Sequence, residues 1–313
     1  MSAQSQELRA LPVFVAAGEA LTDMLRTGAD SWTSQVGGST WNVARVVAGL
    51  GIPSAFAGAI SRDVFGDALA QANAEAALDA RFLQRFAKSP LLAMVYQLNP
   101  PQYFFVGDDS ADLHFDPALL PQQWQQHAQW VHFGGISLAR QPLAGKLVAL
   151  AAELKQAGVS ISYDPNFRAL MDERYDATLR RMAELADVIK VSDEDLQGLF
   201  RSDDVAASFA TLRSWNPQAK FLFTRGAQGA ALYHGDEVWQ AAPPAITVVD
   251  TVGAGDASIG GLLHSLMSHA QRNGGEHLRF AVAAGAAACT AAGATPPSLA
   301  LAEELYRSVT LQG

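Results

Sequence analysis

A glycine-rich segment, Asp250 to Asp256 with the sequence DTVGAGD, precedes a long apolar stretch. The small residues Gly253, Ala254 and Gly255 let the backbone turn and point several N–H groups at one spot. A helix that begins here adds partial positive charge, so the segment suits an anion such as phosphate. Asp256 falls in the first turn of that helix, where its carboxylate can accept a proton from an attacking hydroxyl. An ordinary glycine-rich helix start is the alternative that these residues alone leave open.

The same residues invite comparison with two nucleotide-binding motifs. Gly253, Gly255 and Ser258 fall one residue short of a dinucleotide fingerprint. That fingerprint opens a βαβ unit and requires an acidic residue after a second strand, whereas the 58 residues after Gly255 have a helical pattern. A P-loop fits less well, because Gly145-Lys146 lacks both the glycine five positions before the lysine and the hydroxyl after it.

A second glycine-rich segment, GGSTWN, starts at Gly37. Gly37 and Gly38 permit the close approach of a ligand, and Asn42 lies one helical turn later with both a donor and an acceptor. Asp23, which follows the first apolar strand, can accept hydrogen bonds from two hydroxyls. A sugar needs this combination of groups, although each residue taken alone is also ordinary turn chemistry.

Polar residues also follow three later strands. Arg168, in the segment YDPNFR, supplies a planar cation for phosphate. Since ligands gather at the carboxyl ends of parallel strands, we expect these segments to face one site. Hydroxyl, small and acidic residues suited to a nucleotide and Mg²⁺ occur in the segments KVSDED and TRGAQG, namely Lys190, Ser192, Asp195, Thr224, Gly226 and Gly229.

The elements that must position these residues alternate along most of the chain. Short apolar strands, beginning with Val13 to Ala17, are separated by amphipathic helices, which predicts an α/β fold with a mostly parallel, doubly wound sheet. Ile246 to Val249 is expected to be the last strand before two long apolar helices. Segments within about 20–36 and 82–106 break the alternation, and we expect them to form a small β-sheet lid on a single domain spanning 1–313.

Composition limits the class of protein. Hydrophobic residues make up 49% of the 313 residues, which is enough for a large core, and the net charge of −9 argues against a nucleic-acid partner. The single cysteine, Cys289, excludes an intrachain disulfide. No apolar run reaches the ~18 residues of a membrane span, and Met1 to Arg9 is polar. These features predict a cytoplasmic protein without a membrane partner.

Taken together, the segments resemble the PfkB-type, ribokinase-like carbohydrate kinase family. DTVGAGD is highly specific to that family, and GGSTWN, DPNFR, KVSDED and TRGAQG resemble its other elements in order, from Val13 to about Thr295. The resemblance implies a ribokinase-like fold in which a sugar lies between the lid and the main sheet. It also implies ATP and Mg²⁺ as cofactors, and K⁺ as a further one.

The resemblance assigns roles to individual residues. Asp256 is implied to be the general base, and the amides of Gly253, Ala254 and Gly255 the anion hole. Arg168 is implied to contact phosphate or sugar. The implied sugar-binding residues are Asp23, Gly37, Gly38, Asn42 and Tyr103. The implied nucleotide-binding residues are Lys190, Ser192, Thr224, Gly226, Gly229 and Gly255, while Asp195 and Asp250 correspond to the Mg²⁺ and monovalent-cation positions.

The sequence departs from the family at several of these places. Ser192 and Asp195 replace the Asn and Glu of a common Asn-x-x-Glu element, which puts the Mg²⁺ geometry in question. Ser258 stands where Phe is usual, and Ser61 where Gly is frequent. Trp41 stands where a small residue is commoner, directly beside Asn42, and we expect it to narrow the sugar pocket.

The predicted function is an ATP-dependent sugar kinase, with fructokinase as the first choice because the opening GEALTD and the stretch SADLHFDP look most like that branch. From Ser89 to Ala139 there is no Lys or Arg, so the lid suits a neutral sugar. A 2-dehydro-3-deoxygluconate kinase, a riboside kinase and a non-catalytic sugar or nucleotide sensor are the alternatives. Alternating aromatic residues in the lid predict a homodimer through that sheet.

Overall fold

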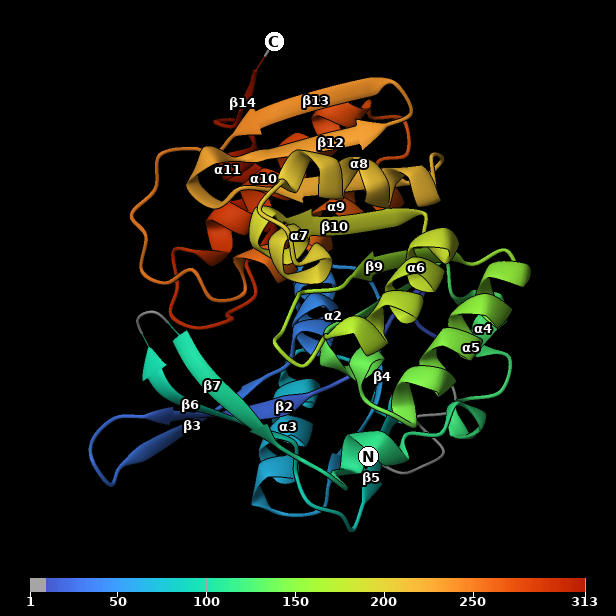
Figure 1. The fold of residues 1–313 in the computed structure, drawn as a ribbon, viewed down its shortest axis with the longest axis vertical. Helices are drawn as coiled ribbons and strands as arrows, with labels where there is room; N and C mark the ends of the chain where they lie inside the picture. The colour runs from blue at the N-terminus through green and yellow to red at the C-terminus, as the bar shows by residue number, and fades with distance from the viewer. Residues whose placement is uncertain (1–9, 99–100, 313) are drawn as a thin grey trace.

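The computed structural model describes residues 10–98 and 101–312, which form a layered α/β structure with a smaller sheet at one side (Figure 1). The polar segment 1–9 and part of the predicted break at 99–101 lie outside the described residues. Ten strands form the large sheet in the order β14-β13-β12-β11-β10-β9-β8-β1-β4-β5. Their bounds are β1 (Phe14–Ala17), β4 (Ser54–Ser61), β5 (Leu83–Phe86), β8 (Trp130–Gly134), β9 (Ser160–Asp164), β10 (Val188–Ser192), β11 (Lys220–Thr224), β12 (Ala230–His234), β13 (Glu237–Ala242) and β14 (Thr310–Gln312).

In the order across the large sheet, neighbouring strands from β5 at one edge as far as β11 pair in parallel. The neighbours from β11 to β14 at the other edge pair antiparallel. The predicted mostly parallel, doubly wound sheet is therefore confirmed. Because parallel strands are covered on both faces, β1, β4 and most of β8 to β10 are buried throughout.

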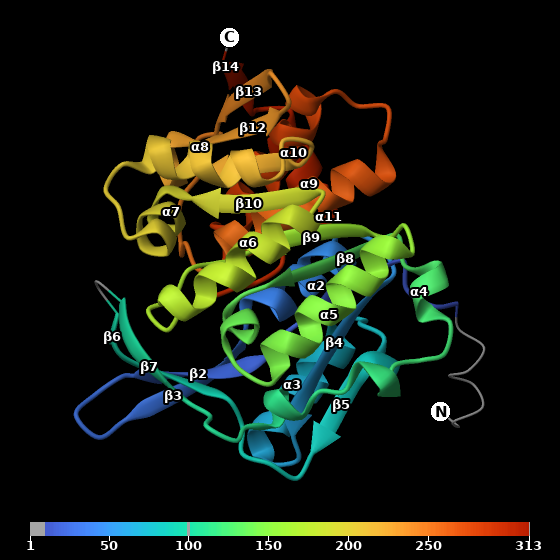
Figure 2. The same cartoon turned by 45° about the vertical axis from the view of Figure 1, so that its right-hand side comes forward.

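Helices cover both faces of the large sheet (Figure 2). One face carries α2 (Ser39–Gly49), α3 (Val64–Glu75), α9 (Ala254–Ser268), α10 (Gly274–Ala288) and α11 (Leu299–Tyr306). The other face carries α4 (Trp124–His127), α5 (Leu143–Gln156), α6 (Asp176–Leu185), α7 (Asp193–Phe200) and α8 (Val205–Trp215). Among the described residues, no helix has both the length and the apolar character to cross a bilayer.

The smaller sheet has the strand order β3-β2-β6-β7 and projects beside the carboxyl ends of the parallel strands (Figure 1). Its strands are β2 (Leu21–Arg26), β3 (Trp32–Gly37), β6 (Leu92–Leu98) and β7 (Pro101–Val106). Two segments far apart in the sequence thus combine, because β2 pairs in parallel with β6. We call this sheet the lid.

Two sequence-based expectations about strands are wrong. The segment 82–86 was expected in the lid, but β5 pairs with β4 and extends the large sheet. Ile246 to Val249 was expected to be a buried strand, but it forms no strand, and Val248 and Val249 are more than half exposed. An apolar run does not reveal whether a partner strand is available, and here the neighbouring backbone bond runs from Val249 N–H to the carbonyl of Cys289.

Candidate active site

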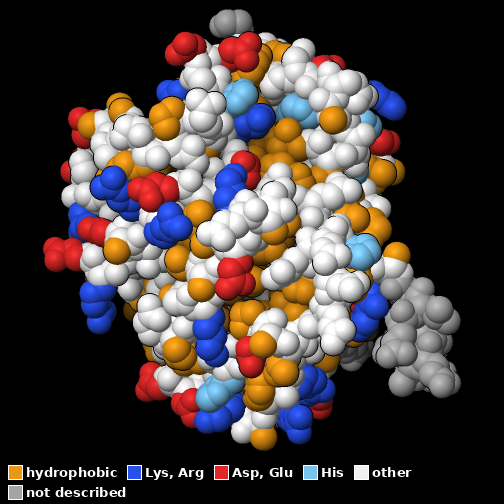
Figure 3. All heavy atoms as spheres, turned by 90° about the vertical axis from the view of Figure 1, so that its right-hand side faces the viewer, with side chains coloured by type: hydrophobic (Ala, Val, Ile, Leu, Met, Phe, Trp, Pro, Cys, Tyr) orange, Lys and Arg blue, Asp and Glu red, His pale blue; other side chains and the backbone are white. Residues whose placement is uncertain are grey.

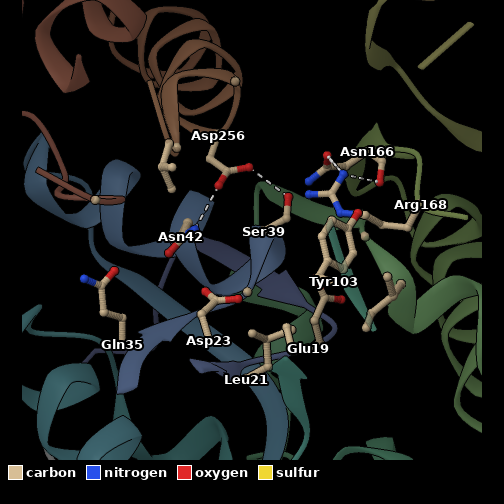
Figure 4. A pocket seen from close by; sticks show the side chains of 18 of the residues that line it. Glu19, Leu21, Asp23, Gln35, Ser39, Asn42, Tyr103, Asn166, Arg168 and Asp256 are labelled. Atoms are coloured by element: carbon tan, nitrogen blue, oxygen red, sulfur yellow. Dashed lines mark hydrogen bonds between the residues drawn. The ribbon is translucent and has the colours of Figure 1, made fainter. Parts of the chain in front are cut away.

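A cavity of about 760 Å³ lies between the lid and the carboxyl ends of the parallel strands (Figure 4). The lid contributes the side chains Leu21, Asp23, Leu25, Gln35, Ala93, Val95, Tyr103 and Phe105. The main domain contributes Glu19, the start of α2, the loop after β9, Lys190 and the loop from Asp250 to Asp256. Segments from the whole length of the chain therefore meet at one place, as the positions of their strand ends predict.

Asp256 is anchored between two helices. It is only 8% exposed and lies in the first turn of α9, and its two carboxylate oxygens accept hydrogen bonds from α2. Ser39 Oγ donates to Oδ1 at 2.8 Å, and Asn42 Nδ2 donates to Oδ2 at 2.9 Å (Figure 4). Burial raises the pKa of Asp256, while the bonds from Asn42 and Ser39 oppose that rise. A carboxylate held in this way can take a proton from a hydroxyl in the cavity.

The backbone turn before α2 brings Ser39 and Asn42 to this place. Gly38 has φ 114°, a conformation that L side chains rarely adopt, and an added Cβ would lie 2.8 Å from the carbonyl oxygen of Glu19. Gly37 does not line the cavity itself. A side chain there would overlap the carboxylate of Asp23, so Gly37 leaves room for that group.

Asp23 is the acidic residue that the lid presents to the cavity. It lies in β2 opposite Gln35 of β3, which also lines the cavity. Burial raises the pKa of Asp23 from 3.8 to about 6, and the charge of Arg168 acts against that rise. The sequence indicated Asp23 but not Gln35, because an exposed-looking Gln in a short strand carries no signal of its own.

Glu19 is a second buried carboxylate at the cavity that the sequence did not single out as a site residue. Its Oε2 accepts from the backbone N–H of Ser137 at 3.3 Å and from Thr40 Oγ1 at 3.4 Å. Glu19 thereby joins the loop after β8 to α2, and burial raises its pKa. Its partners indicate a role in holding the cavity wall.

The glycine-rich loop that is predicted to bind an anion lies at the start of α9. Gly253, in the left-handed region with φ 79°, and Gly255 line the cavity, but Ala254 does not, and its N–H donates to the carbonyl of Thr251. The Lys190 ammonium lies beside this loop, since a Cβ added to Gly255 would be 3.3 Å from Lys190 Nζ. The helix start and the ammonium together give one end of the cavity the positive charge that phosphate needs.

Lys190 is fixed by two buried carboxylates. Its Nζ lies 3.2 Å from Asp164 Oδ2 and 3.4 Å from Asp195 Oδ2. Burial disfavours the ammonium, but the charges of Asp164, Asp195 and Asp256 outweigh it and raise the pKa of Lys190. Lys190 is therefore a fixed cation at the cavity, and Asp164 is a partner that the sequence analysis left unassigned.

Arg168 also lines the cavity, with its guanidinium held by its own loop. Nη1 donates to Asn166 Oδ1 at 2.6 Å and to the carbonyl of Phe167 at 2.7 Å (Figure 4). Asn166 has φ 45°, so this loop turns sharply after β9. The predicted strand-end cation is thus at the site, on the side of the cavity that faces Tyr103 of the lid.

The other predicted nucleotide-binding residues are not among those that line the cavity. Ser192 caps α7, since its Oγ accepts from the N–H of Asp195 at 3.0 Å. Thr224 ends β11, next to Ser192 in register. Gly226 and Gly229 both have positive φ in the turn that follows. Their nucleotide-binding role remains a prediction.

The two predicted metal positions differ in how free their carboxylates are. Asp195 Oδ1 accepts from Phe167 N–H and Oδ2 from Ser192 N–H, each at 2.8 Å, so both oxygens already serve the fold. Asp250 lines the cavity and accepts from the N–H groups of Val252 and Gly293. Within residues 10–98 and 101–312, no group of three or more His, Cys, Asp or Glu side chains is arranged to hold a metal ion.

The expectation that Trp41 narrows the sugar pocket is wrong. Trp41 is 1% exposed, belongs to the core under α2, and donates from Nε1 to Asn73 Oδ1 at 3.3 Å. The sequence neighbour of Asn42 points the other way, because adjacent residues of a helix diverge by about 100°. Trp41 instead supports Arg45, whose guanidinium lies 4.4 Å from the ring centroid.

Arg45 is a residue that the sequence analysis missed. Its Nη1 donates to the carbonyl of Ala294 at 3.2 Å and lies 3.5 Å from Asn42 Oδ1. The second contact orients the Asn42 amide so that its nitrogen faces Asp256. Arg45 therefore joins α2 to the loop after α10, both of which border the site.

Comparisons with known proteins agree on one family. A model described as pfkB family carbohydrate kinase matches residues 14–301. A fructokinase of Klebsiella pneumoniae is 32% identical over 302 residues, which cover 93% of this chain and 97% of the relative. A solved fructokinase of Xylella fastidiosa with bound ATP superposes with a TM-score of 0.86 at 28% identity, covering 95% of this chain and 99% of its own. An aminoimidazole riboside kinase of Salmonella enterica, solved with aminoimidazole riboside and an ATP analogue, gives a TM-score of 0.80 at 28% identity, covering 94% and 99% of the two chains.

Proposed function

Because this chain belongs to the pfkB family of carbohydrate kinases, we propose that it transfers the γ-phosphate of ATP to a hydroxymethyl group of D-fructose. The observation that carries the proposal is the placement of Asp256, which faces the cavity between Ser39 and Asn42 at the start of the helix that follows the anion-binding loop. The fructose acceptor is suggested by the relatives from Klebsiella pneumoniae and Xylella fastidiosa.

The cavity supplies each group that the reaction needs. The sugar lies under the lid with its hydroxyls bonded to Asp23 and Asn42. Asp256 takes the proton of the attacking hydroxyl while that oxygen bonds to the γ-phosphorus, and ADP leaves. The amides of Gly253 and Gly255 and the ammonium of Lys190 stabilise the negative charge of the transferring group.

Mg²⁺ enters this scheme with ATP. It neutralises phosphate charge when bound, and the committed oxygens of Asp195 argue that its ligands are mainly phosphate and water. Asp250, exposed to the cavity, is the proposed neighbour of K⁺. Since the reaction consumes ATP, we place it in the cytoplasm.

The cations near the lid are bonded within the protein, which favours a neutral sugar over an acidic one. Arg26 donates to the carbonyls of Gly28 and Ala29. Arg85 and Lys88 form ion pairs with Asp67 and Asp109, each at 2.6 Å, and none of the three lines the cavity. Of the described cations that line the cavity, Lys190 is already paired with Asp164 and Asp195, so a carboxylate on the sugar would have to rely on Arg168. A sensor without catalysis would have no need for the anchored carboxylate of Asp256.

The test is ATP turnover with a panel of sugars. We expect D-fructose to be phosphorylated with a kcat/KM at least about tenfold above that of 2-dehydro-3-deoxygluconate, a difference of about 1.4 kcal/mol. Aminoimidazole riboside and ribose complete the panel, because a riboside kinase is the nearest alternative. A higher kcat/KM for the acidic sugar or for the riboside would reject fructose as the acceptor, and no turnover with any sugar would reject the kinase.

We also propose a homodimer formed through the lid. In β7, Tyr103 and Phe105 face the cavity, and the alternate residues Phe104 and Val106 are exposed on the other side. The ring of Tyr96 is tilted against that of Phe104, with ring centroids 6.3 Å apart. This outer face of the lid is an apolar surface on strands that a second copy can cover.

Sedimentation at micromolar concentration tests the dimer. The chain has a mass of 33.2 kDa, and we expect about twice that value. Phe104→Ser should return the protein to a monomer, whereas Val238→Ser, at an exposed position of β13, should not. A monomeric wild type, or a dimer unaffected by Phe104→Ser, would contradict the proposed interface.

A further inference from the structure

A second cavity, of about 400 Å³, lies at the opposite end of the large sheet from the candidate active site. Trp130 and Lys220 are the first residues of the parallel strands β8 and β11, so this cavity is at the amino ends of the strands. Its remaining wall is formed by β12, β13, the end of α9 and the start of α10. Figure 3 views the molecule from this side, and its upper half shows histidine, lysine or arginine side chains beside exposed hydrophobic ones.

One wall of the cavity is a sheet surface. Strand register places Lys220, His234 and Glu237 in one row across three neighbouring strands. The next row on the same face contains Leu232 and Trp239. The strand register therefore places charged groups next to an apolar surface.

Two cations face the cavity. No ion pair is found for Lys220 within the described part of the chain. Arg272 is held in place, with its guanidinium 5.0 Å from the ring centroid of Tyr306 and Nη1 donating to Ser265 Oγ at 3.2 Å. Glu237 is the one acidic residue among the described lining residues, and it is exposed at the rim.

A buried histidine forms part of the cavity wall. His277 is 5% exposed and lines the cavity, and its Nδ1 lies 2.9 Å from Ser265 Oγ. Because Ser265 accepts from Arg272, its own proton is available for Nδ1, and the ring then carries its proton on Nε2. Burial and the charges of Arg272 and Lys220 lower the pKa of His277, while the charge of Glu276 and a hydrogen bond with the Arg272 backbone oppose that fall, so the ring is tied into the cavity wall.

The start of α10 also borders the cavity. Gly274 lines it at the first position of this 15-residue helix, whose N-terminus is closed by a capping box between Asn273 and Glu276. A Cβ at Gly274 would overlap the ring of Trp239, so the glycine lets the tryptophan pack directly on the helix start. A flat aromatic wall therefore lies directly against the helix start.

We propose that this cavity binds a small organic anion, a carboxylate or phosphate monoester whose apolar or planar body lies against Trp130 and Trp239. Lys220 and Arg272 attract the charge and donate hydrogen bonds to it. The volume is within the range of about 300–1,000 Å³ that small-molecule sites occupy. The site is separate from the sugar and ATP cavity and does not depend on the proposed acceptor.

Calorimetric titration tests the site with phenyl phosphate and benzoate as probes and benzamide as the neutral match for benzoate. The active site is first filled with D-fructose and a non-hydrolysable ATP analogue, so that phosphate cannot bind there. We expect at least one anionic probe to bind with a Kd below about 5 mM and benzamide at least about tenfold more weakly. Inorganic phosphate alone should bind more weakly than phenyl phosphate, because it leaves the tryptophans uncovered.

Variants locate the binding. Lys220→Met should weaken binding of the anionic probe at least about fivefold with kinase turnover unchanged, and Arg272→Met gives an independent second variant. Arg307→Met, an exposed cation outside the cavity, is the matched control and should leave Kd unchanged. No heat with either anion, equal binding of benzamide and benzoate, or equal effects of Lys220→Met and Arg307→Met would overturn the proposal.

Discussion

Replacing Asp23 with Asn should stabilise the folded protein and weaken the binding of the sugar. The lid buries this carboxylate, and burial raises its pKa from 3.8 to about 6. A raised pKa means that folding favours the protonated form. Wild-type stability from this group is therefore complete below the unfolded pKa of 3.8 and falls as the pH rises through about 6. An amide at this position has no charge to bury.

The pKa shift of Asp23 sets the size of the gain in stability. A difference of about two pKa units corresponds to about 3 kcal/mol, which is the upper limit of the gain at pH 7.5. At pH 5, between the two pKa values, about half of the gain is expected, and below pH 3.5 very little. Loss of the ionic acceptor should weaken sugar binding by about 1.5–3 kcal/mol, which lowers kcat/KM roughly 10- to 150-fold.

Denaturant unfolding of Asp23→Asn and wild type at pH 5 and pH 7.5 measures the first effect, and sugar kinetics measures the second. Asp30→Asn is the matched control, because Asp30 is an exposed carboxylate in the turn of the same hairpin. We also expect the wild-type kcat/KM for sugar to fall as the pH drops below about 6. A variant less stable than wild type at pH 7.5, or a stability difference that does not grow between pH 5 and pH 7.5, would refute the reasoning.

Two further predictions concern the base and its support. Asp256→Asn should reduce kcat by roughly 10²–10⁴-fold while the sugar still binds, as measured by steady-state turnover and sugar titration, and a variant within about threefold of wild type would exclude Asp256 as the base. Arg45→Met should lower kcat about tenfold, because it removes the donor that orients Asn42 and ties α2 to Ala294. Arg45→Lys should restore part of that loss, the exposed Arg62→Met should have no effect, and equal turnover of Arg45→Met and wild type would exclude the positioning role.

Much of the candidate site could be read from local sequence. The segment around Asp256 needs only small residues and a helix start, and both are visible in DTVGAGD. Gly38 likewise indicates a backbone conformation that few other residues adopt. Arg168 was found because polar residues that follow a strand have a predictable position in a parallel sheet.

Other features depend on contacts between distant segments. The hydrogen bonds from Ser39 and Asn42 to Asp256 join residues more than 210 positions apart, and nothing local to either segment encodes them. The same is true of Asp164, which becomes the partner of Lys190 only when β9 and β10 lie side by side. A periodic pattern in the sequence does not predict which buried polar side chains will pair.

Local sequence was enough to predict the alternating α/β architecture, the glycine-rich loop before α9 and the family, because periodicity, turn residues and short motifs are local properties. The face that each side chain takes, and the strand that each segment joins, depend on the folded chain. The tertiary structure placed Trp41 in the core, moved the segment 83–86 from the lid to the large sheet, and left Val248 and Val249 exposed. Burial and strand pairing depend on which partner surface is available, and that surface exists only once the chain has folded.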